Sequence, residues 1–158
     1  MATEGFQYQA TGKRIAPPSD AACWAERVGN RAWLGHNAGG STVLMADPDD
    51  NLPSSFAPGE LLKLALAGCV GMTGDGPIGR RLGEDFAGTI VIGSSKHATD
   101  DRYEAFDEQV LLDVAALTPA ERDALAAVLT RAVQRGCTVG LTLKNGAAIT
   151  SHVDAAAS

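Results

Sequence analysis

Cysteines are the residues of this chain best suited to chemistry, and there are three of them, Cys23, Cys69 and Cys137. They form an odd set without a CxxC pair, which argues against a structural disulfide framework. In a reducing compartment such a set indicates either inert thiols or a catalytic pair with one thiol to spare. A reactive cysteine acts as its thiolate, whereas a free thiol is mostly protonated at neutral pH. Thiol chemistry therefore needs a neighbouring group that stabilises the sulfur anion.

A guanidinium is the group that best stabilises a thiolate, and Arg27 and Arg31 are the candidates. We favour Arg31, because it follows the turn signal Gly29-Asn30 and a loop there could lean over a neighbouring helix. Glu60 is the carboxylate that would orient the guanidinium through a bidentate pair. The plainer alternatives are solvated strand charges for both arginines and, for Glu60, an acid that complements the N-terminus of its own helix.

A predicted helix over residues 56–75, FAPGELLKLALAGCVGMTGD, holds Cys69 in its middle. Pro58 suits a first helical turn, where its missing N–H is not needed. The segment is apolar on nearly every side, so we expect it to lie in an interior, and because it has no run of about 18 or more apolar residues that interior should be a protein core and not a bilayer. A lone cysteine in such a helix is most often a small core residue, so a reactive Cys69 needs support from other residues.

The remaining elements predict an α+β fold. Turn signals at Gly29-Asn30 and Gly39-Gly40 divide an antiparallel meander with strands over 23–28, 31–37 and 40–46. Two further strands are expected over 88–97 and 105–115, and Thr118-Pro119 begins an amphipathic helix that ends near Gly136. The order of strands first, then a helix, strands, a helix and a strand is the basis of this α+β prediction.

Three segments carry weaker predictions. The segment 74–86, GDGPIGRRLGEDF, indicates a chain break followed by a short helical piece, since Pro77 interrupts the pattern. Beyond Cys137 we expect a short turn of helix or strand, a turn at Asn145-Gly146 and a last strand. Residues 1–20 are expected to form a loose leader before a single domain over 21–158.

Composition excludes several kinds of function. The formal net charge is −6, and such an acidic surface disfavours binding to nucleic acid or to an anionic membrane. The N-terminus lacks the pattern of a signal peptide, so a cytoplasmic location is the default expectation.

The three histidines have no metal-ligand spacing to the cysteines, and we expect neither a metal nor a cofactor. The GxGxxG match at 74–79 follows a helix and contains Pro77, so it does not indicate a phosphate loop.

The central helix and the two later landmarks of the chain together resemble a known family. The sequence PGELLKLALAGC (58–69) combines a Pro-x-Glu-Leu-Leu helix start with a cysteine eleven residues after the proline. A second cysteine, Cys137, comes just past the later amphipathic helix. This pattern resembles the OsmC/Ohr family over about residues 23–153, and it looks closer to the OsmC type than to the Ohr branch.

The resemblance implies a thiol-dependent peroxidase that reduces organic hydroperoxides to alcohols, with Cys69 as the peroxidatic and Cys137 as the resolving cysteine. It implies an OsmC-like fold in which antiparallel sheets wrap around a buried central helix, in an intertwined homodimer with its active sites at the subunit interface. The disulfide between the two cysteines would be reduced by a dithiol, for Ohr members usually a lipoyl group. An arginine from the early strands and a carboxylate at the helix start, here Arg31 and Glu60, would flank the thiol.

The chain departs from the family pattern at two places. The family's glutamate usually follows the proline directly, where this chain has Gly59, and the second cysteine is commonly followed by proline, where this chain has Thr138. The first change leaves open a stress-associated or apolar-ligand-binding dimer with weak or no peroxidase activity. A thiol acyl-transfer enzyme is a third alternative, but it needs a histidine near Cys69.

Overall fold

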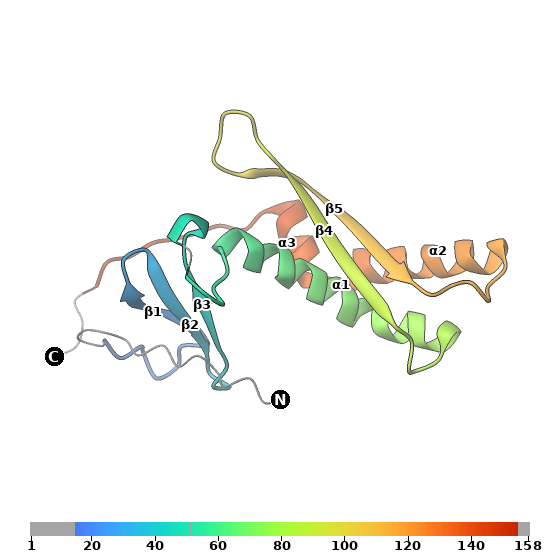
Figure 1. Cartoon of the computed structure of the whole chain (residues 1–158), viewed down its shortest axis with the longest axis horizontal. Helices are drawn as coiled ribbons and strands as arrows, with labels where there is room; N and C mark the ends of the chain where they lie inside the picture. The colour runs from blue at the N-terminus through green and yellow to red at the C-terminus, as the bar shows by residue number, and fades with distance from the viewer. Residues whose placement is uncertain (1–14, 51, 155–158) are drawn as a thin grey trace. The chain divides into compact units, whose positions relative to one another are not determined.

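The computed structural model describes residues 15–50 and 52–154, and the elements follow one another as strands, a helix, a hairpin and two further helices (Figure 1). They are β1 (Cys23–Gly29), β2 (Ala32–Asn37), β3 (Thr42–Met45), the 3-10 helix η1 (Pro48–Asp50), α1 (Pro58–Leu82), β4 (Gly88–Lys96), β5 (Tyr103–Leu112), α2 (Pro119–Gly136) and α3 (Thr138–Asn145). Both sheets are antiparallel, which confirms the α+β prediction. Most of the leader expected over 1–20 lies outside the described residues.

The chain forms two compact units. The first contains the residues up to Leu61 together with the segment from His152, and the second runs from Leu62 to Ser151. The helix α1 begins in the first unit, and most of its length belongs to the second.

The first unit contains the predicted meander, with strand order β1-β2-β3. One face of the sheet carries its core, made of Val28, Ala32, Leu44 and Ala46. After β3 the chain returns to the sheet, because Phe56 forms a parallel bridge with Met45. Two backbone hydrogen bonds fix this return, from the N–H of Ala46 to the carbonyl of Phe56 at 3.1 Å and from the N–H of Phe56 to the carbonyl of Leu44 at 2.9 Å. The start of α1 is thereby held against the end of β3.

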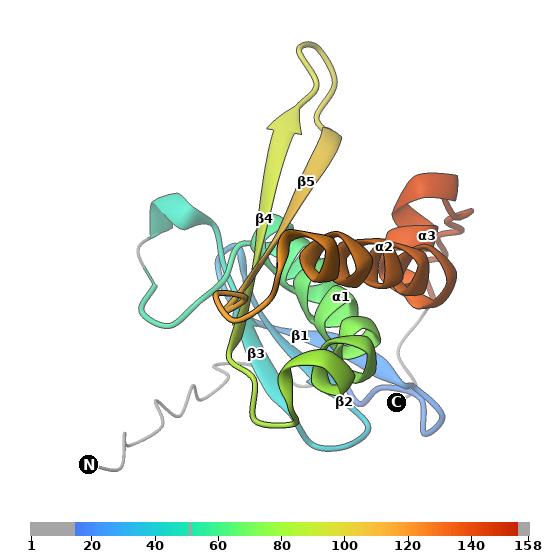
Figure 2. The same ribbon diagram turned by 90° about the vertical axis from the view of Figure 1, so that its right-hand side faces the viewer.

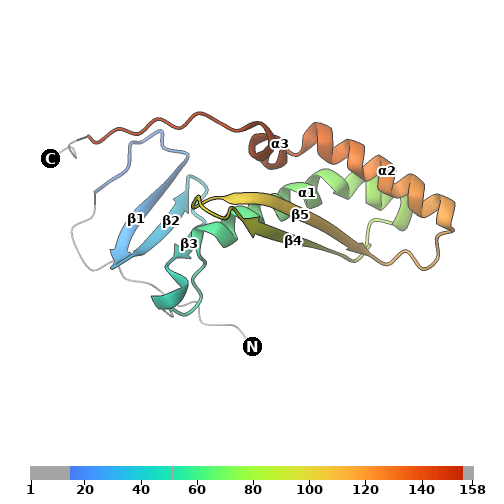
Figure 3. The ribbon, with the colours of Figure 1, turned by 90° about the horizontal axis from the view of Figure 1, so that it is seen from above.

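In the second unit α1 packs against the β4–β5 hairpin on one side and against α2 on another. Figures 1 and 3 show α1 running alongside the hairpin, whose loop extends past the helices in Figure 2. The helix approaches closely at its glycines: a Cβ at Gly71 would lie 3.2 Å from Ile90, and one at Gly74 would lie 2.6 Å from Leu129. The core between these elements contains Leu66, Val70 and Cys137, with Cys69, Ile90, Ile92, Phe106, Val110, Val133, Val139 and Leu143 packed against it.

The helix α1 is longer than predicted, and the chain break expected in 74–86 is wrong. The helix runs through Pro77 to Leu82. Proline removes one backbone hydrogen bond, but the helix continues because the residues on either side of it are held by packing. Gly74 and Ile78 are both buried, and Gly74 gives α2 the close approach described above.

The later part of the chain confirms one prediction and corrects another. Thr118 and Glu121 form the capping box at the start of α2, as the sequence indicated. The expected last strand after Asn145-Gly146 is wrong, because α3 ends at Asn145 and residues 146–154 form no regular element. A strand needs a partner for its backbone and for its apolar side chains, and Ile149 and Val153 are almost fully exposed in the chain.

Only one stripe of α1 is buried by the chain itself, consisting of Leu66, Val70, Gly74 and Ile78. Leu64 is 51% exposed and Met72 is 78% exposed. The apolar sequence of the helix led us to expect burial on all sides. The single chain buries only part of α1. Among residues 15–50 and 52–154, no helix is long and apolar enough to cross a membrane.

Candidate active site

Two of the three cysteines lie together in the second unit, both as free thiols. Cys69 projects from α1, is half-buried, and packs on the core cluster that contains Cys137. Cys137 follows α2 directly and is buried, with only 1% of its surface exposed. The fold thus brings together the two residues to which the family resemblance gave complementary roles.

Cys137 lies at the junction of two helices and caps both. Its backbone N–H donates to the carbonyl of Val133 at 3.0 Å, which ends α2. Its Sγ accepts a hydrogen bond from the N–H of Gly140 at 3.3 Å, which satisfies one of the free donors in the first turn of α3. Gly140 also leaves room for the sulfur, because a Cβ at that position would lie 3.1 Å from it.

The pKa of Cys69 lies below its ordinary value. The largest cause is a hydrogen bond with the Cys137 side chain, followed by hydrogen bonding from the backbone of Val139. The backbone of Thr138 and the hydroxyl of Thr73 act in the same direction, whereas burial opposes them. Thr138 and Val139 are the first two residues of α3, so free N–H groups at a helix N-terminus stabilise the thiolate.

The pKa of Cys137 is shifted the other way. Burial raises it first, because a desolvated sulfur anion is unfavourable, and the hydrogen bond with Cys69 raises it further. The negative charge of Glu108 on β5 acts in the same direction. When neighbouring groups have pKa values pushed apart, their chemical roles differ. Cys69 therefore ionises more readily than Cys137.

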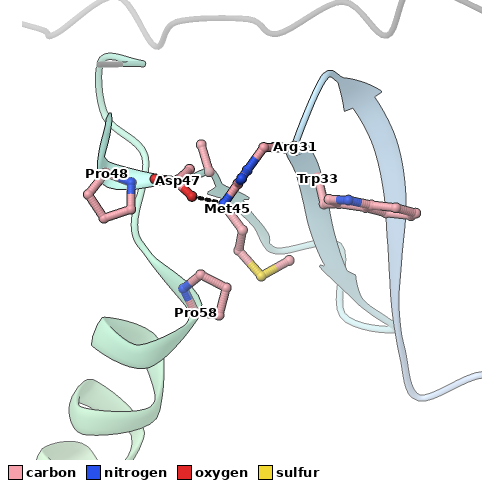
Figure 4. Close-up of a pocket in the computed structure, with 7 residues that line it drawn as sticks. Arg31, Trp33, Met45, Asp47, Pro48 and Pro58 are labelled. Atoms are coloured by element: carbon pink, nitrogen blue, oxygen red, sulfur yellow. Dashed lines mark hydrogen bonds and ion pairs between the residues drawn. The ribbon is translucent and has the colours of Figure 1, made fainter. Parts of the chain in front are cut away.

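The predicted arginine, Arg31, lies in the first unit beside a carboxylate that sequence reasoning missed. Its guanidinium forms an ion pair with Asp47. Figure 4 shows the two side chains pointing toward one another at a pocket of about 190 Å³ that Pro58, at the start of α1, also lines. The other lining residues, Trp33, Met45, Ala46 and Pro48, make the pocket mostly apolar.

The predicted turn between β2 and β3 would not have located Asp47. The ladder between these strands ends at the pair Trp33 and Met45, so that Arg31 precedes β2 and Asp47 follows β3. A two-residue turn at Gly39-Gly40 would set His36 opposite Val43, whereas His36 lies opposite Thr42. The prediction was therefore one residue out of register, and a slip of one residue changes which side chains face each other.

The other two predicted charges have different surroundings. Glu60 accepts a hydrogen bond from the N–H of Ala57 at 2.9 Å, so its carboxylate caps the helix that contains it. Arg27 is exposed on β1 and, among the described residues, takes part in no ion pair. The assignment of Glu60 to the reacting site stays a prediction from the family resemblance.

The remaining cysteine and the histidines show no link to the thiol pair. Cys23 is exposed at the start of β1. No histidine is among the groups that shift the pKa of Cys69. His97 instead contacts Asp100 at 3.2 Å in the β4–β5 loop. Within the part of the chain that is described, no group of histidines, cysteines and carboxylates could hold a metal ion.

Sequence relatives place the chain in a family. Uncharacterized proteins from Mycobacterium tuberculosis and Mycobacterium bovis are each 40% identical to it over 130 residues, which are 82% of this chain and 93% of theirs. The chain belongs to the family of these mycobacterial proteins. No family model matches the sequence.

Solved structures identify the fold. A putative osmotic stress induced and detoxification response protein from Psychrobacter arcticus matches with a TM-score of 0.60 and 17% identity, over 81% of this chain and 91% of that protein. The organic hydroperoxide resistance protein OhrB of Bacillus subtilis matches with a TM-score of 0.51 and 15% identity, over 78% and 90%. A putative redox protein from Lactobacillus casei matches with a TM-score of 0.52 and 17% identity, over 85% and 94%. The chain has the OsmC/Ohr fold, as its sequence resemblance implied.

Proposed function

We propose that the chain is a thiol-dependent peroxidase that reduces organic hydroperoxides to alcohols. The observation that carries this proposal is the pair of neighbouring thiols with opposite pKa shifts, Cys69 lowered and Cys137 raised. One thiol is thereby prepared to attack as an anion, while the other is held as a protonated partner. The organic hydroperoxide resistance protein and the putative redox protein with the same fold support this reading.

The first step is a displacement on the peroxide O–O bond. The Cys69 thiolate attacks one peroxide oxygen, so that an S–O bond forms while the O–O bond breaks. The alkoxide leaves and takes a proton from water to become the alcohol, and Cys69 becomes a sulfenic acid. A guanidinium would stabilise both the thiolate and the departing alkoxide, and Arg31 is our candidate for this role.

The second step removes the sulfenic acid before it is oxidised further. The Cys137 thiol condenses with it, so that an S–S bond forms and water leaves. Cys137 suits this step because its side chain is already hydrogen-bonded to that of Cys69. An external dithiol then reduces the disulfide by exchange and is itself oxidised, which returns both thiols. The family resemblance suggests a lipoyl group as one such dithiol.

The substrate we propose is an alkyl or fatty hydroperoxide. Cys69 packs against the apolar side chains of the second core cluster, which would contact the hydrocarbon part of such a substrate. Sites with apolar walls and few polar groups select ligands by their hydrocarbon parts. The pocket beside Arg31 has the same character, with one ion pair among apolar residues.

Peroxide consumption by the pure protein tests this function. With cumene hydroperoxide and a dithiol such as dihydrolipoamide, the wild-type chain should consume peroxide, and Cys69→Ser should not. Cys23→Ser is the matched control, because Cys23 is exposed at the edge of the first sheet, and it should keep the wild-type rate. Equal turnover by the wild type and Cys69→Ser would overturn the proposal.

A binding protein without efficient catalysis is the second candidate, and Gly59 favours it. The family's usual carboxylate is absent at that position, and Glu60 is engaged in capping its own helix. Such a protein would bind apolar ligands and gain thermal stability from them, because they bind the native state. A rapid, stoichiometric loss of two thiols on peroxide addition would exclude this candidate.

We also propose that the protein acts as a homodimer. Leu64 and Met72 on α1 are exposed, and so are Val91 and Leu111, which are diagonal neighbours on the outer face of the β4–β5 hairpin. These apolar side chains would be buried against a second copy of the chain, which is the arrangement that the family resemblance implies. The structural support for this proposal is that all four of these apolar side chains are exposed to solvent in the single chain.

A further inference from the structure

The carboxylate that works with Arg31 need not come from the start of α1. In the first unit Arg31 lies two residues before Trp33 and Asp47 lies two residues after Met45, which is the end pair of the β2–β3 ladder, and the two side chains form an ion pair (Figure 4). Both residues thus flank the same end of the β2–β3 ladder, and this position brings their opposite charges within reach of each other.

A second hydrogen bond holds the Asp47 carboxylate in place. Its Oδ1 accepts a hydrogen bond from the N–H of Asp49 at 3.0 Å, and its Oδ2 faces the guanidinium of Arg31. Its side chain is 20% exposed, whereas that of Arg31 is 67% exposed. The preceding residue, Ala46, is buried and hydrogen-bonded to Phe56. Asp47 is thus the rigid member of the pair, and Arg31 is the member that it can orient.

The backbone of Arg31 gives an independent indication that this side chain has a function. Its φ is +50°, in the left-handed region that hairpin turns usually fill with glycine or asparagine. An arginine is a poor choice for that conformation on structural grounds. Strained residues of this kind are concentrated at functional sites, where the surrounding structure holds them in place.

Glu60 is engaged elsewhere, because its carboxylate accepts the N–H of Ala57. Gly59, at the family's usual position for a carboxylate, has no side chain. We propose that Asp47 is the positioning residue of Arg31, and that it replaces the missing first-turn glutamate in the peroxidase reaction. This inference rests on the proposed function and names a residue of that same site.

The chemical effect would be to aim the free donors of the guanidinium. Arg31 uses Nη2 for Asp47, and a guanidinium has five N–H donors in a rigid plane. Fixing one edge of that plane fixes the direction of the remaining donors, which then meet the developing alkoxide without reorganisation. Without Asp47, Arg31 would keep its positive charge, but its N–H donors would no longer be held in one direction.

The test compares Asp47→Asn with Glu60→Gln, a matched removal of one negative charge at each carboxylate. The measurements are kcat/KM for cumene hydroperoxide with a dithiol and the melting temperature of each variant. We expect Asp47→Asn to lower kcat/KM by about tenfold or more, because misdirected catalytic groups lose about that much or more. Glu60→Gln should stay within about threefold of the wild type, and Asp47→Glu should retain more activity than Asp47→Asn.

A double substitution separates positioning from a merely structural effect. If Asp47 acts through Arg31, then Asp47→Asn should have little further effect on kcat/KM in a chain that already carries Arg31→Ala. If the losses of kcat/KM caused by Asp47→Asn and Arg31→Ala multiplied in the double variant, the inference would be overturned. Full activity of Asp47→Asn, or a large loss of activity in Glu60→Gln, would also overturn it. If the wild type itself consumed no peroxide, the proposed function would fail and this inference with it. An active wild type with an equally active Asp47→Asn would overturn the inference alone.

Discussion

At the scale of single residues, the start of α3 explains why two ordinary cysteines differ. The Sγ of Cys137 accepts from Gly140, and the two preceding N–H groups of the same turn, on Thr138 and Val139, stabilise Cys69. The first turn of one short helix thus serves both sulfur atoms. The family's usual proline after the second cysteine would have no N–H to offer, so Thr138 adds a donor to the site.

Removing the Cys137 thiol should change how Cys69 titrates. Because the hydrogen bond with Cys137 is the largest cause of the lowered pKa, Cys137→Ala should raise the pKa of Cys69. The midpoint of its alkylation rate would then move to higher pH, so that at neutral pH the variant reacts more slowly. Cys137→Ser retains an O–H donor and should shift the midpoint less. Site-resolved alkylation followed by mass spectrometry measures both, and an unchanged midpoint in Cys137→Ala would contradict this explanation.

The strained turn at Arg31 makes a separate prediction about stability. Arg31→Ala and Arg31→Gly both remove the guanidinium, but only glycine relieves the left-handed conformation. Arg31→Gly should therefore be more stable than Arg31→Ala by about 1 kcal/mol. Urea unfolding at one fixed protein concentration compares the two, and equal midpoints would show that the turn is not strained.

At the scale of elements, the sequence predicted the strands well because their alternation and their turns are local signals. The same signals did not locate Asp47, because a two-residue turn at Gly39-Gly40 would place β2 and β3 one residue out of the register that they adopt. The length of α1 and the end of the chain were not predictable in this way. Pro77 is tolerated because of packing around Gly74 and Ile78, and residues 146–154 have no strand partner in the single chain.

Gly74 on α1 should not tolerate a side chain. A Cβ at this position would lie 2.6 Å from Leu129 and 3.3 Å from Ile78. Gly74→Ala should therefore lower the free energy of unfolding by about 2 kcal/mol, even though alanine favours a helix more than glycine does. Chemical unfolding measures the change, and a variant as stable as the wild type or more stable would contradict the close packing of α1 on α2.

At the scale of the whole molecule, the apolar residues that the single chain leaves exposed are the unexplained feature of the fold. A helix as apolar as α1 was expected to be covered on all sides, yet Met72 and Leu64 are exposed. The sequence predicted the burial, but it could not say that one chain would supply only part of it. We attribute the remainder to a second copy of the chain.

Charging the exposed side of α1 should therefore separate the two copies. The wild type should have about twice the chain mass of 16.3 kDa in solution. Leu64→Glu should shift the protein toward the monomer, because it places a charge in the proposed interface without touching the core of its own chain. Arg131→Glu, at an exposed position of α2, is the control and should leave the mass unchanged. Light scattering after size exclusion measures these masses, and a monomeric wild type would refute the dimer.

The most direct test of the redox reading is to count and map thiols after a single oxidation. Reduced wild-type protein is treated with one equivalent of cumene hydroperoxide without reductant, digested and examined by mass spectrometry. We predict that two thiols per chain are lost, that peptides containing Cys69 and Cys137 are joined by a disulfide, and that Cys23 remains a thiol. Recovery of Cys69 and Cys137 as unreacted thiols, or a disulfide that involves Cys23, would contradict the proposed function.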